Sequence, residues 1–370
     1  MAHTININER QIGPNQATFF IAEEGQMNQG NLDVALKMID TATQAGADAI
    51  EFQLAIANDF YVPSHPLHAV YTRRQFELSQ MKALFDYASE KGIIAQASPL
   101  SCKLPEKLAH FGCQIFNITS SDINNPDMID AVAETGRPFL MSTAMATLKE
   151  VDWAVNRALQ VATGRFGLLH GQHIMFTGTG QGVPESETSL RTIRFFHERY
   201  GCPIGFIDHT SNPFMPALAV ASGACMVTKH FTYDRKLQGP DWHICLEPEE
   251  LKETIRMVRL TDTTRGEPTK ILARGEASDQ REMRRSIVAT QYLSAGTILN
   301  RHHICFKRPG TGLAPTETHL ILGKKLNQTL SPNDQILLNH IEQPSRPLVF
   351  KPAIRPFVHK ELHLSLETQK

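Results

Sequence analysis

The sequence predicts an α/β protein built on a (β/α)8 barrel, followed by a small β-rich domain. A helix-like segment, a glycine and a short apolar run ending in polar residues recur along roughly the first 260 residues. Eight runs fit this pattern, and few of them alternate cleanly, which is typical of parallel strands covered by helices. Eight such units in about 250 residues match a barrel, and a doubly wound open sheet is the alternative.

The candidate strands follow one another at regular intervals. In chain order they are "ATFFIAEEG", "ADAIEFQ", "IIAQASP", "CQIFNITSSD", "RPFLMST", "RFGLLHG", "CPIGFIDHT" and "ACMVTKHF". The last seven each follow a glycine, the residue that most readily ends a helix in the left-handed conformation.

The segments between these runs have helical spacing. In the first, one face of a helix carries Leu32, Ala35, Leu36, Ile39 and Ala42, and Asn31 or Asp33 can cap its start. The segments 74–91 and 147–163 are predicted helices of the same kind. No GxGxxG or GxxxxGK[ST] motif follows a strand, which disfavours the nucleotide-binding forms of an open sheet.

Changes in composition predict the domain boundaries. The barrel occupies residues 1–262, and a polar linker follows over 263–282. Short β-like runs broken by Gly and Pro predict a small domain over 283–343. The proline-rich tail, 344–370, is expected to pack as an arm or to be partly disordered.

Charge and composition exclude several classes of function. The net charge of −1 provides no general field for nucleic acid or an acidic membrane. The longest apolar runs are too short to span a bilayer, and the N-terminus lacks the apolar core of a signal peptide. Six scattered cysteines without a CxxC pair indicate a protein of the reducing cytoplasm.

Polar side chains gather where the predicted strands end, and chemistry in such barrels takes place at that end. The residues at these ends are Glu23, Glu51, Gln53, Ser98, Asn117, Ser120, Asp122, Ser142, His170, His173, Asp208, His209, Lys229 and His230. Strand ends are also polar simply because they meet loops and water, so position alone does not assign a role.

Two histidines on adjacent strands suggest a metal site. His209 and His230 can share one divalent metal, because neutral imidazole is a common ligand. Two hydrogen-bonded histidines in a polar funnel are the alternative. Glu23 and Asp122 are candidate acid/base groups, although either can instead cap a loop.

Two rigid turns add candidate binding residues. In "LQGPDW", a Gly-Pro turn can hold Asp241 over the barrel mouth. In "FKRPGTG", Arg308 comes directly before a Pro-Gly turn of the small domain. Taken singly, each motif is also typical of an ordinary turn.

Together these motifs resemble the sialic acid synthase family. The resemblance covers about residues 17–342 and includes "FIAEEG", "AGADAIEFQ", "STAM", "IDHTS", "KHFTYDRKLQGPDW", "RRSIVA" and "FKRPGTG". It implies a barrel followed by an antifreeze-like domain, in a domain-swapped homodimer. It also implies condensation of phosphoenolpyruvate with an N-acylated hexose to a nine-carbon 2-keto acid, for surface polysaccharide.

The resemblance also assigns roles to single residues. It makes His209 and His230 ligands of manganese, with magnesium as the alternative, and Glu23 a glutamate of the barrel mouth. Sugar-binding positions are Gln53 and Asp241, and Arg308 enters the neighbouring subunit's site. Positions that hold phosphoenolpyruvate are Ser98, Ser120 and Ser142. The position of a glutamate proposed for proton transfer is Asp122, and those of a substrate-site asparagine and tyrosine are His173 and Met175.

Several positions depart from the family pattern. Glu51 and Asn117 stand where the family usually has lysines, and Ile207 stands where it has a serine. Candidates for the missing positive charge are His170, His173, Lys229 and Arg235. Two other hypotheses therefore remain open. One is an enzyme of the same fold with a substrate less anionic than phosphoenolpyruvate, and the other is a catalytically silent homologue.

Overall fold

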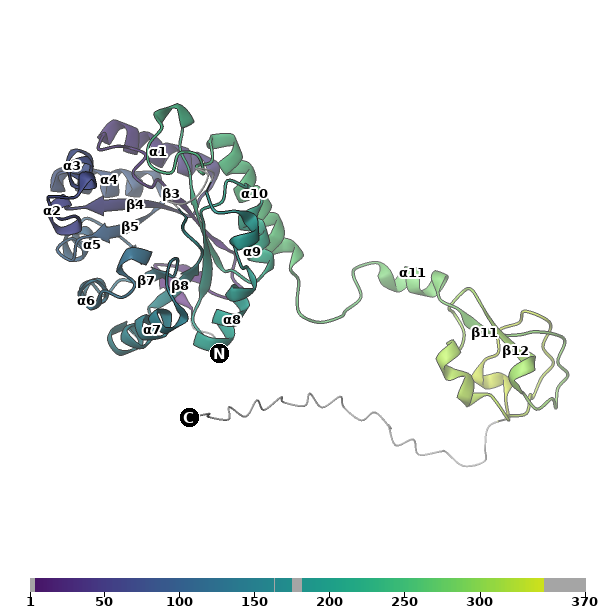
Figure 1. Ribbon diagram of the computed structural model, residues 1–370. Helices are drawn as coiled ribbons and strands as arrows, with labels where there is room; N and C mark the ends of the chain where they lie inside the picture. Colours follow the sequence, from purple (N-terminus) through teal and green to yellow (C-terminus); the bar gives the residue numbers. More distant parts are fainter. Residues whose placement is uncertain (1–3, 163, 175–181, 343–370) are drawn as a thin grey trace, which may run out of the picture. The chain divides into compact units, whose positions relative to one another are not determined.

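Eight parallel strands close into a barrel, which confirms the predicted fold (Figure 1). The computed structural model describes residues 4–162, 164–174 and 182–342. Each strand pairs with the next along the chain, and the last pairs with the first. The barrel strands are β3 (Phe19–Glu23), β4 (Ala49–Ala55), β5 (Ile94–Leu100), β6 (Ile115–Ile118), β7 (Phe139–Ser142), β8 (Phe166–His170), β9 (Ile204–Asp208) and β10 (Met226–His230).

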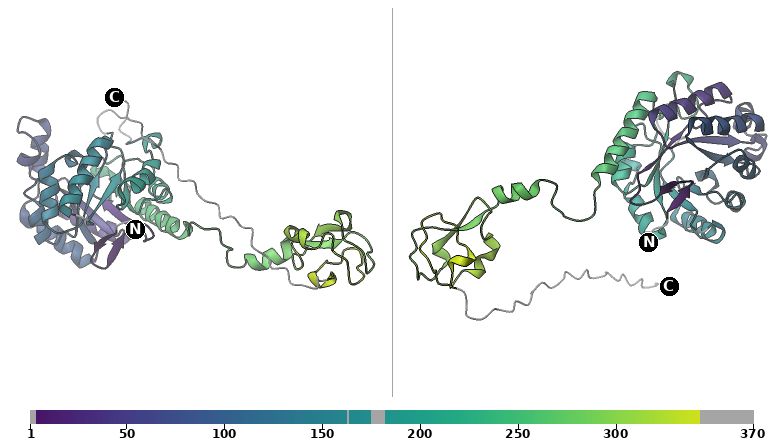
Figure 2. Two further views of the ribbon diagram at one scale, coloured as in Figure 1. Left: turned by 90° about the horizontal axis from the view of Figure 1, so that it is seen from below. Right: turned by 180° about the vertical axis from the view of Figure 1, so that it is seen from behind.

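Helices surround the strands, as the further views in Figure 2 also show. They are α1 (Leu32–Ala45), α2 (Ala57–Phe60), α3 (Pro66–Arg74), α4 (Leu78–Lys91), α5 (Pro105–His110), α6 (Pro126–Glu134), α7 (Leu148–Ala162), α8 (Arg191–Tyr200), α9 (Met215–Ala221) and α10 (Pro248–Thr264). No helix among the described residues combines the length and apolar character needed to cross a bilayer.

The predicted helix over 74–91 begins later than expected. Arg74 is the last residue of α3, and α4 begins at Leu78 after a capping box between Glu77 and Gln80. This local cap starts a new helix, and hydrophobic spacing does not register such a break. For α1 the prediction of a cap is confirmed, because the side chain of Asn31 accepts a hydrogen bond from the backbone N–H of Val34.

Alternation along each strand decides which residues can reach the site. In β4, Ile50 and Phe52 belong to the apolar core between barrel and helices. Ala49 belongs instead to the core inside the barrel. Because successive strand residues point to opposite faces, Glu51 and Gln53 also face the inside, above Ala49. The acid in "AIEFQ" is therefore an inward-facing residue.

A hairpin closes the opposite end of the barrel. It consists of β1 (Ile5–Ile7) and β2 (Arg10–Ile12), which pair antiparallel. Its isoleucines pack with Phe19, Leu140 and other residues of the barrel's inner core. This end of the barrel is filled by apolar side chains, so polar chemistry is confined to the carboxyl ends of the strands.

A second compact unit begins at Pro268. It contains α11 (Glu276–Met283) and the antiparallel strands β11 (Ser286–Ala289) and β12 (Ile304–Lys307), and it has its own apolar core. The stretch 263–282, expected to be a linker, includes the end of α10 and most of α11. The predicted tail, 344–370, lies outside the described residues.

Candidate active site

The carboxyl ends of the barrel strands surround a cavity of about 300 Å³, the central cavity. Ten of the predicted site residues line it: Glu23, Gln53, Asn117, Ser120, Ser142, His173, Ile207, His209, His230 and Asp241. The barrel therefore brings together residues that are more than two hundred positions apart in the chain.

His209 and His230 lie side by side at one wall of this cavity. Their ring centroids are 5.2 Å apart, and the ring of His173 lies 4.8 Å from that of His209. Burial lowers the pKa of both His209 and His230, so their imidazoles favour the neutral form. The Nδ1 atoms of both rings are buried without a hydrogen-bond partner among the described residues.

The histidine pair fits a divalent metal only in part. Neutral imidazoles with unpartnered nitrogens are suitable ligands. However, within the described ranges no group of three or more His, Cys, Asp or Glu side chains is arranged to hold a metal. The pair would therefore need oxygen atoms of water or substrate to complete the coordination sphere, which suits manganese or magnesium.

A close glycine sets the position of His230. Gly25 follows β3 with φ of +54°, and a Cβ at this residue would lie only 2.5 Å from Nδ1 of His230. The backbone of the loop after β3 thus packs directly against the imidazole. Only glycine combines this left-handed conformation with such a close approach.

Glu23 faces the histidines from the next strand. Its Oε2 lies 3.5 Å from Nε2 of His230, and its Oε1 accepts a 2.7 Å hydrogen bond from Nε2 of Gln53. Burial raises the pKa of Glu23 to about 7. A carboxyl group with this pKa can hold or release a proton near neutral pH, which is the property required of a general acid or base.

The loop after β10 holds Asp241 at the cavity wall. The φ of Asp241 is 55°, and its carbonyl oxygen accepts a hydrogen bond from the backbone of Ile244. A Cβ at Gly239 would lie 2.8 Å from the sulfur of Met27, so the loop packs closely on the segment after β3. The turn thereby presents a carboxylate to the central cavity, as the sequence predicted.

Beneath the cavity, five polar side chains form a hydrogen-bonded group that we call the belt. Its members are Glu51, Gln96, Ser98, Asn117 and Ser142, from β4, β5, β6 and β7. Glu51 Oε1 accepts from Ser98 Oγ at 2.5 Å and from Asn117 Nδ2 at 2.8 Å, and Oε2 accepts from Gln96 Nε2 at 2.8 Å. Ser142 Oγ donates to Asn117 Oδ1 at 3.1 Å. Glu51 is completely buried at the centre of the belt.

Comparison with known proteins identifies the family. Residues 38–270 match the NeuB family, and residues 284–342 match the SAF domain.

The chain belongs to the NeuB family.

Several relatives of this NeuB-family protein are named as synthases of N-acetylneuraminate-9-phosphate, N,N'-diacetyllegionaminic acid or pseudaminic acid. It is 30% identical to N-acetylneuraminate-9-phosphate synthase of Mus musculus, over 91% of this chain and 96% of that one. It is 29% identical to N,N'-diacetyllegionaminic acid synthase of Legionella pneumophila, over 89% and 96% of the two chains. An uncharacterised protein of Methanocaldococcus jannaschii is 31% identical, over 90% and 97%.

Solved structures show the same likeness. The N-acetylneuraminic acid synthetase of Leptospira borgpetersenii superposes with a TM-score of 0.70 at 30% identity, covering 76% of this chain and 95% of that one. The spore coat polysaccharide biosynthesis protein SpsE of Bacillus subtilis superposes with a TM-score of 0.63 at 26% identity, covering 92% and 99%. The predicted family is thus confirmed.

In this NeuB-family protein, Glu51 and Asn117 occupy the two positions where the family usually has lysines. The side chain of Asn117 donates a hydrogen bond to that of Glu51. The four candidates for the missing positive charge, His170, His173, Lys229 and Arg235, do not supply it to the cavity. Lys229 is fully buried 2.9 Å from Asp208, and Arg235 pairs with Glu250. His170 faces the carbonyl oxygen of Thr188, and burial lowers the pKa of His173, the one replacement that lines the cavity.

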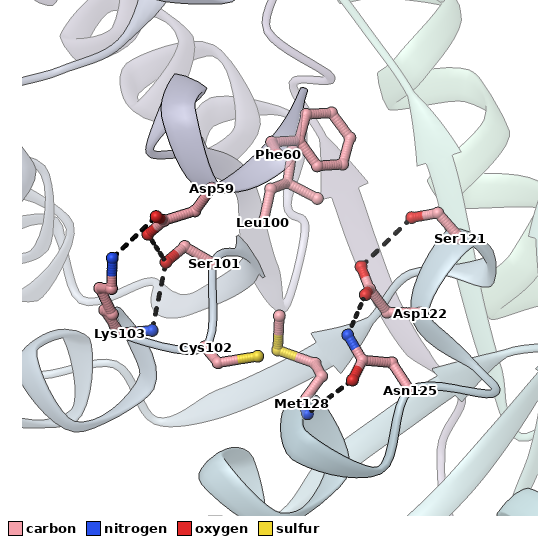
Figure 3. A pocket seen from close by; sticks show the side chains of 10 residues that line it. All are labelled: Asp59, Phe60, Leu100, Ser101, Cys102, Lys103, Ser121, Asp122, Asn125 and Met128. Carbon is pink, nitrogen blue, oxygen red and sulfur yellow. Dashed lines mark hydrogen bonds and ion pairs between the residues drawn. The ribbon is translucent and has the colours of Figure 1, made fainter. Parts of the chain in front are cut away.

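Asp122 lies in a second cavity of about 400 Å³, shown in Figure 3. This side cavity shares Phe60, Leu100 and Ser121 with the central cavity. Asp122 accepts a 2.7 Å hydrogen bond from Nδ2 of Asn125, the residue that caps α6. The structure therefore places Asp122 beside the central cavity, apart from Glu23 and the histidines.

Other residues depart from or add to the expectations. Arg308 belongs to the second unit, where it follows β12 and is exposed. Ser98 and Glu51 lie below the central cavity and do not line it.

Sequence reasoning missed Gln96, although a glutamine inside the apolar run "IIAQASP" was a usable signal. It also missed Tyr61 and Tyr71, which line the cavity from beyond the strand ends.

Proposed function

We propose that this NeuB-family protein joins a three-carbon 2-keto-acid unit to the aldehyde of an N-acylated hexose, giving a nine-carbon 2-keto acid. The observation that carries this proposal is the convergence of Glu23, Gln53, His209, His230 and Asp241 on one cavity. The named relatives are synthases of this product class, and several act in routes to sugar acids or polysaccharide.

His209 and His230 would hold a divalent metal, manganese or alternatively magnesium. When bound, such a metal supplies Lewis acidity that polarises an aldehyde oxygen. Glu23 holds or moves a proton at the substrate through its Oε2, which has no hydrogen-bond partner among the described residues, while the hydrogen bond from Gln53 fixes its other oxygen. Asp241 can accept hydrogen bonds from sugar hydroxyls at the cavity wall.

Phosphoenolpyruvate is the donor that the family resemblance implies. In that reaction the enol carbon forms a bond to the aldehyde carbon, water adds to the resulting cationic carbon, and phosphate leaves. Ser120 and Ser142 line the cavity with hydroxyl groups, of which that of Ser142 donates to Asn117. Asp122 would take part only through the neighbouring side cavity.

We propose the assembly and location on the same basis. The working form is a domain-swapped homodimer in which Arg308 of one subunit enters the other's site. All six cysteines are free, in keeping with a reducing cytoplasm. The product would serve surface polysaccharide synthesis.

The proposal is tested by supplying the purified protein with manganese, a panel of N-acyl hexoses and a three-carbon donor, either phosphoenolpyruvate or pyruvate. Mass spectrometry should detect a nine-carbon 2-keto acid that depends on metal. Binding of substrates without product from any combination would instead favour a catalytically silent homologue.

A second candidate function keeps the fold and the acceptor but uses a donor less anionic than phosphoenolpyruvate. The observation that favours it is the belt, because an acid and an amide occupy positions where a phosphate group would need cations.

A further inference from the structure

The hydrogen bonds within the belt occupy donors that a highly charged ligand would require. The hydroxyl of Ser98, one side-chain N–H of Asn117 and one of Gln96 are all donated to Glu51. The hydroxyl of Ser142 is donated to Asn117. Only Asn117 and Ser142 of the belt line the central cavity. Because one N–H of Asn117 and the hydroxyl of Ser142 already donate within the belt, a ligand in the cavity cannot use them.

The belt is also held firmly in this arrangement. Its side chains come from four neighbouring strands, and each of its five residues is at most 2% exposed. Turning Asn117 or Ser98 toward a ligand would leave an oxygen of the buried Glu51 with fewer donors, which is costly for a buried polar group. Glu51 therefore acts as a positioning residue that keeps these donors away from the ligand.

No fixed positive charge compensates among the described lining residues. None of them is Lys or Arg, and their carboxyl groups belong to Glu23 and Asp241. Their only potential cations are histidines, and histidines that bind a metal are neutral. Lys103, at the neighbouring side cavity, pairs with Asp59 at 2.8 Å. A phosphate ester that also carries a carboxylate would therefore find no lysine or arginine in this lining, and the proposed metal and Arg308 of the partner subunit would be the cations left to balance it.

A singly charged carboxylate is better matched. Thr119, Ser120 and Ser121 also line the cavity. The hydroxyls of Thr119 and Ser121 are hydrogen-bonded to each other at 2.7 Å, which leaves the hydroxyl of Ser120 to donate to one carboxylate group. We infer that the donor is a monoanionic, non-phosphorylated 2-keto acid of the pyruvate class. This inference rests on the proposed condensation and deepens it by naming the donor.

The step with such a donor needs no further reactant. A proton leaves the methyl carbon of pyruvate, and the resulting enolate carbon forms a bond to the aldehyde carbon of the sugar. The aldehyde oxygen takes up a proton and becomes a hydroxyl. The product is the same nine-carbon 2-keto acid, with no water consumed and no phosphate released. Glu23 lines the cavity in which this proton moves, and among the described residues its Oε2 has no hydrogen-bond partner.

The first test compares donors on the wild-type chain with manganese present. Calorimetry should give pyruvate at least about tenfold tighter binding than phosphoenolpyruvate, since one basic partner is missing for each added charge. Equal or tighter binding of phosphoenolpyruvate, or no binding of either donor, would overturn the inference.

Product analysis separates this inference from the proposed function. Product from pyruvate and an N-acyl hexose supports both. Product with phosphate release from phosphoenolpyruvate supports the condensation and overturns the donor inference. No product from either donor counts against the condensation, and the binding ratio still decides the donor class.

The second test changes the belt. The double variant Glu51→Lys/Asn117→Lys should bind phosphoenolpyruvate at least about tenfold more tightly than the wild type, because each lysine supplies a cation. A surface double variant, Glu90→Lys/Asn156→Lys, changes the net charge equally at exposed positions of α4 and α7 and should leave the affinity unchanged. A similar gain in both variants would overturn the inference. Should the belt variant not fold, the wild-type binding ratio alone decides.

Discussion

Glu51 shows how one residue can fit a fold and depart from a family. Its place on β4 points it into the barrel, where it is fully buried. Three side chains donate hydrogen bonds to it, so burial is satisfied without a cation. Burial, followed by the nearby charge of Glu23, raises the pKa of Glu51 from 4.5 to about 8. The folded protein thus favours the protonated acid near neutral pH.

This raised pKa predicts a pH-dependent stability. Between pH 4.5 and about 8 the folded chain holds a proton on Glu51 that the unfolded chain has lost. The contribution is fully present below the unfolded pKa and is lost as pH rises through the folded pKa, at about 1.4 kcal/mol per pH unit. Denaturant unfolding from pH 5 to 8 should therefore show wild type losing stability relative to Glu51→Gln. Parallel curves for the two proteins would refute the assigned pKa.

The histidine pair makes a prediction about metal affinity. Replacing His209 with Ala removes one of two imidazoles and should weaken manganese binding by at least about a hundredfold, since even outer partners of metal ligands matter tenfold or more. Calorimetry measures this loss. His197→Ala is the matched control, because this ring contacts the carbonyl oxygen of Gly223 and does not line the central cavity. Unchanged affinity in His209→Ala would exclude the pair as the metal site.

At the scale of elements, the loop after β3 predicts a second effect on the metal site. Gly25→Ala and Gly46→Ala both force a left-handed alanine, which costs about 1 kcal/mol. Only at Gly25 does the new methyl group meet His230, since nothing lies within 4 Å at Gly46. Both variants should lose similar stability from backbone strain, but only Gly25→Ala should also weaken manganese binding, by at least about tenfold. Equal affinity in both variants would show that the loop does not position His230.

The strands and their polar ends could be read from the sequence because both follow local rules. Apolar runs after helix-ending glycines predicted seven of the eight barrel strands, and position at the strand ends placed Glu23, Gln53 and His230 at the mouth. The belt could not be read in the same way. Its hydrogen bonds join residues up to 66 positions apart and depend on the register between strands. The cap that begins α4 at Leu78 likewise depends on local hydrogen bonds that spacing does not reveal.

At the scale of the whole molecule, the barrel and the second unit each have an apolar core. The proposed role of Arg308 in a partner's site predicts complementation between two inactive variants. Arg308→Ala and Glu23→Gln should each abolish product formation. Mixed and co-refolded in equal amounts, they should recover about a quarter of wild-type activity, because half the dimers are mixed and each has one intact site. A mixture that stays inactive would contradict the exchange of Arg308 between subunits.

The central claim is that this NeuB-family barrel condenses a three-carbon 2-keto acid with an N-acyl hexose. The most direct measurement uses carbon-13-labelled pyruvate or phosphoenolpyruvate with manganese, a panel of N-acyl hexoses and the wild-type protein. The account predicts that mass spectrometry finds the label in a nine-carbon 2-keto acid, formed faster from pyruvate. Absence of labelled product with every sugar and both donors would contradict it.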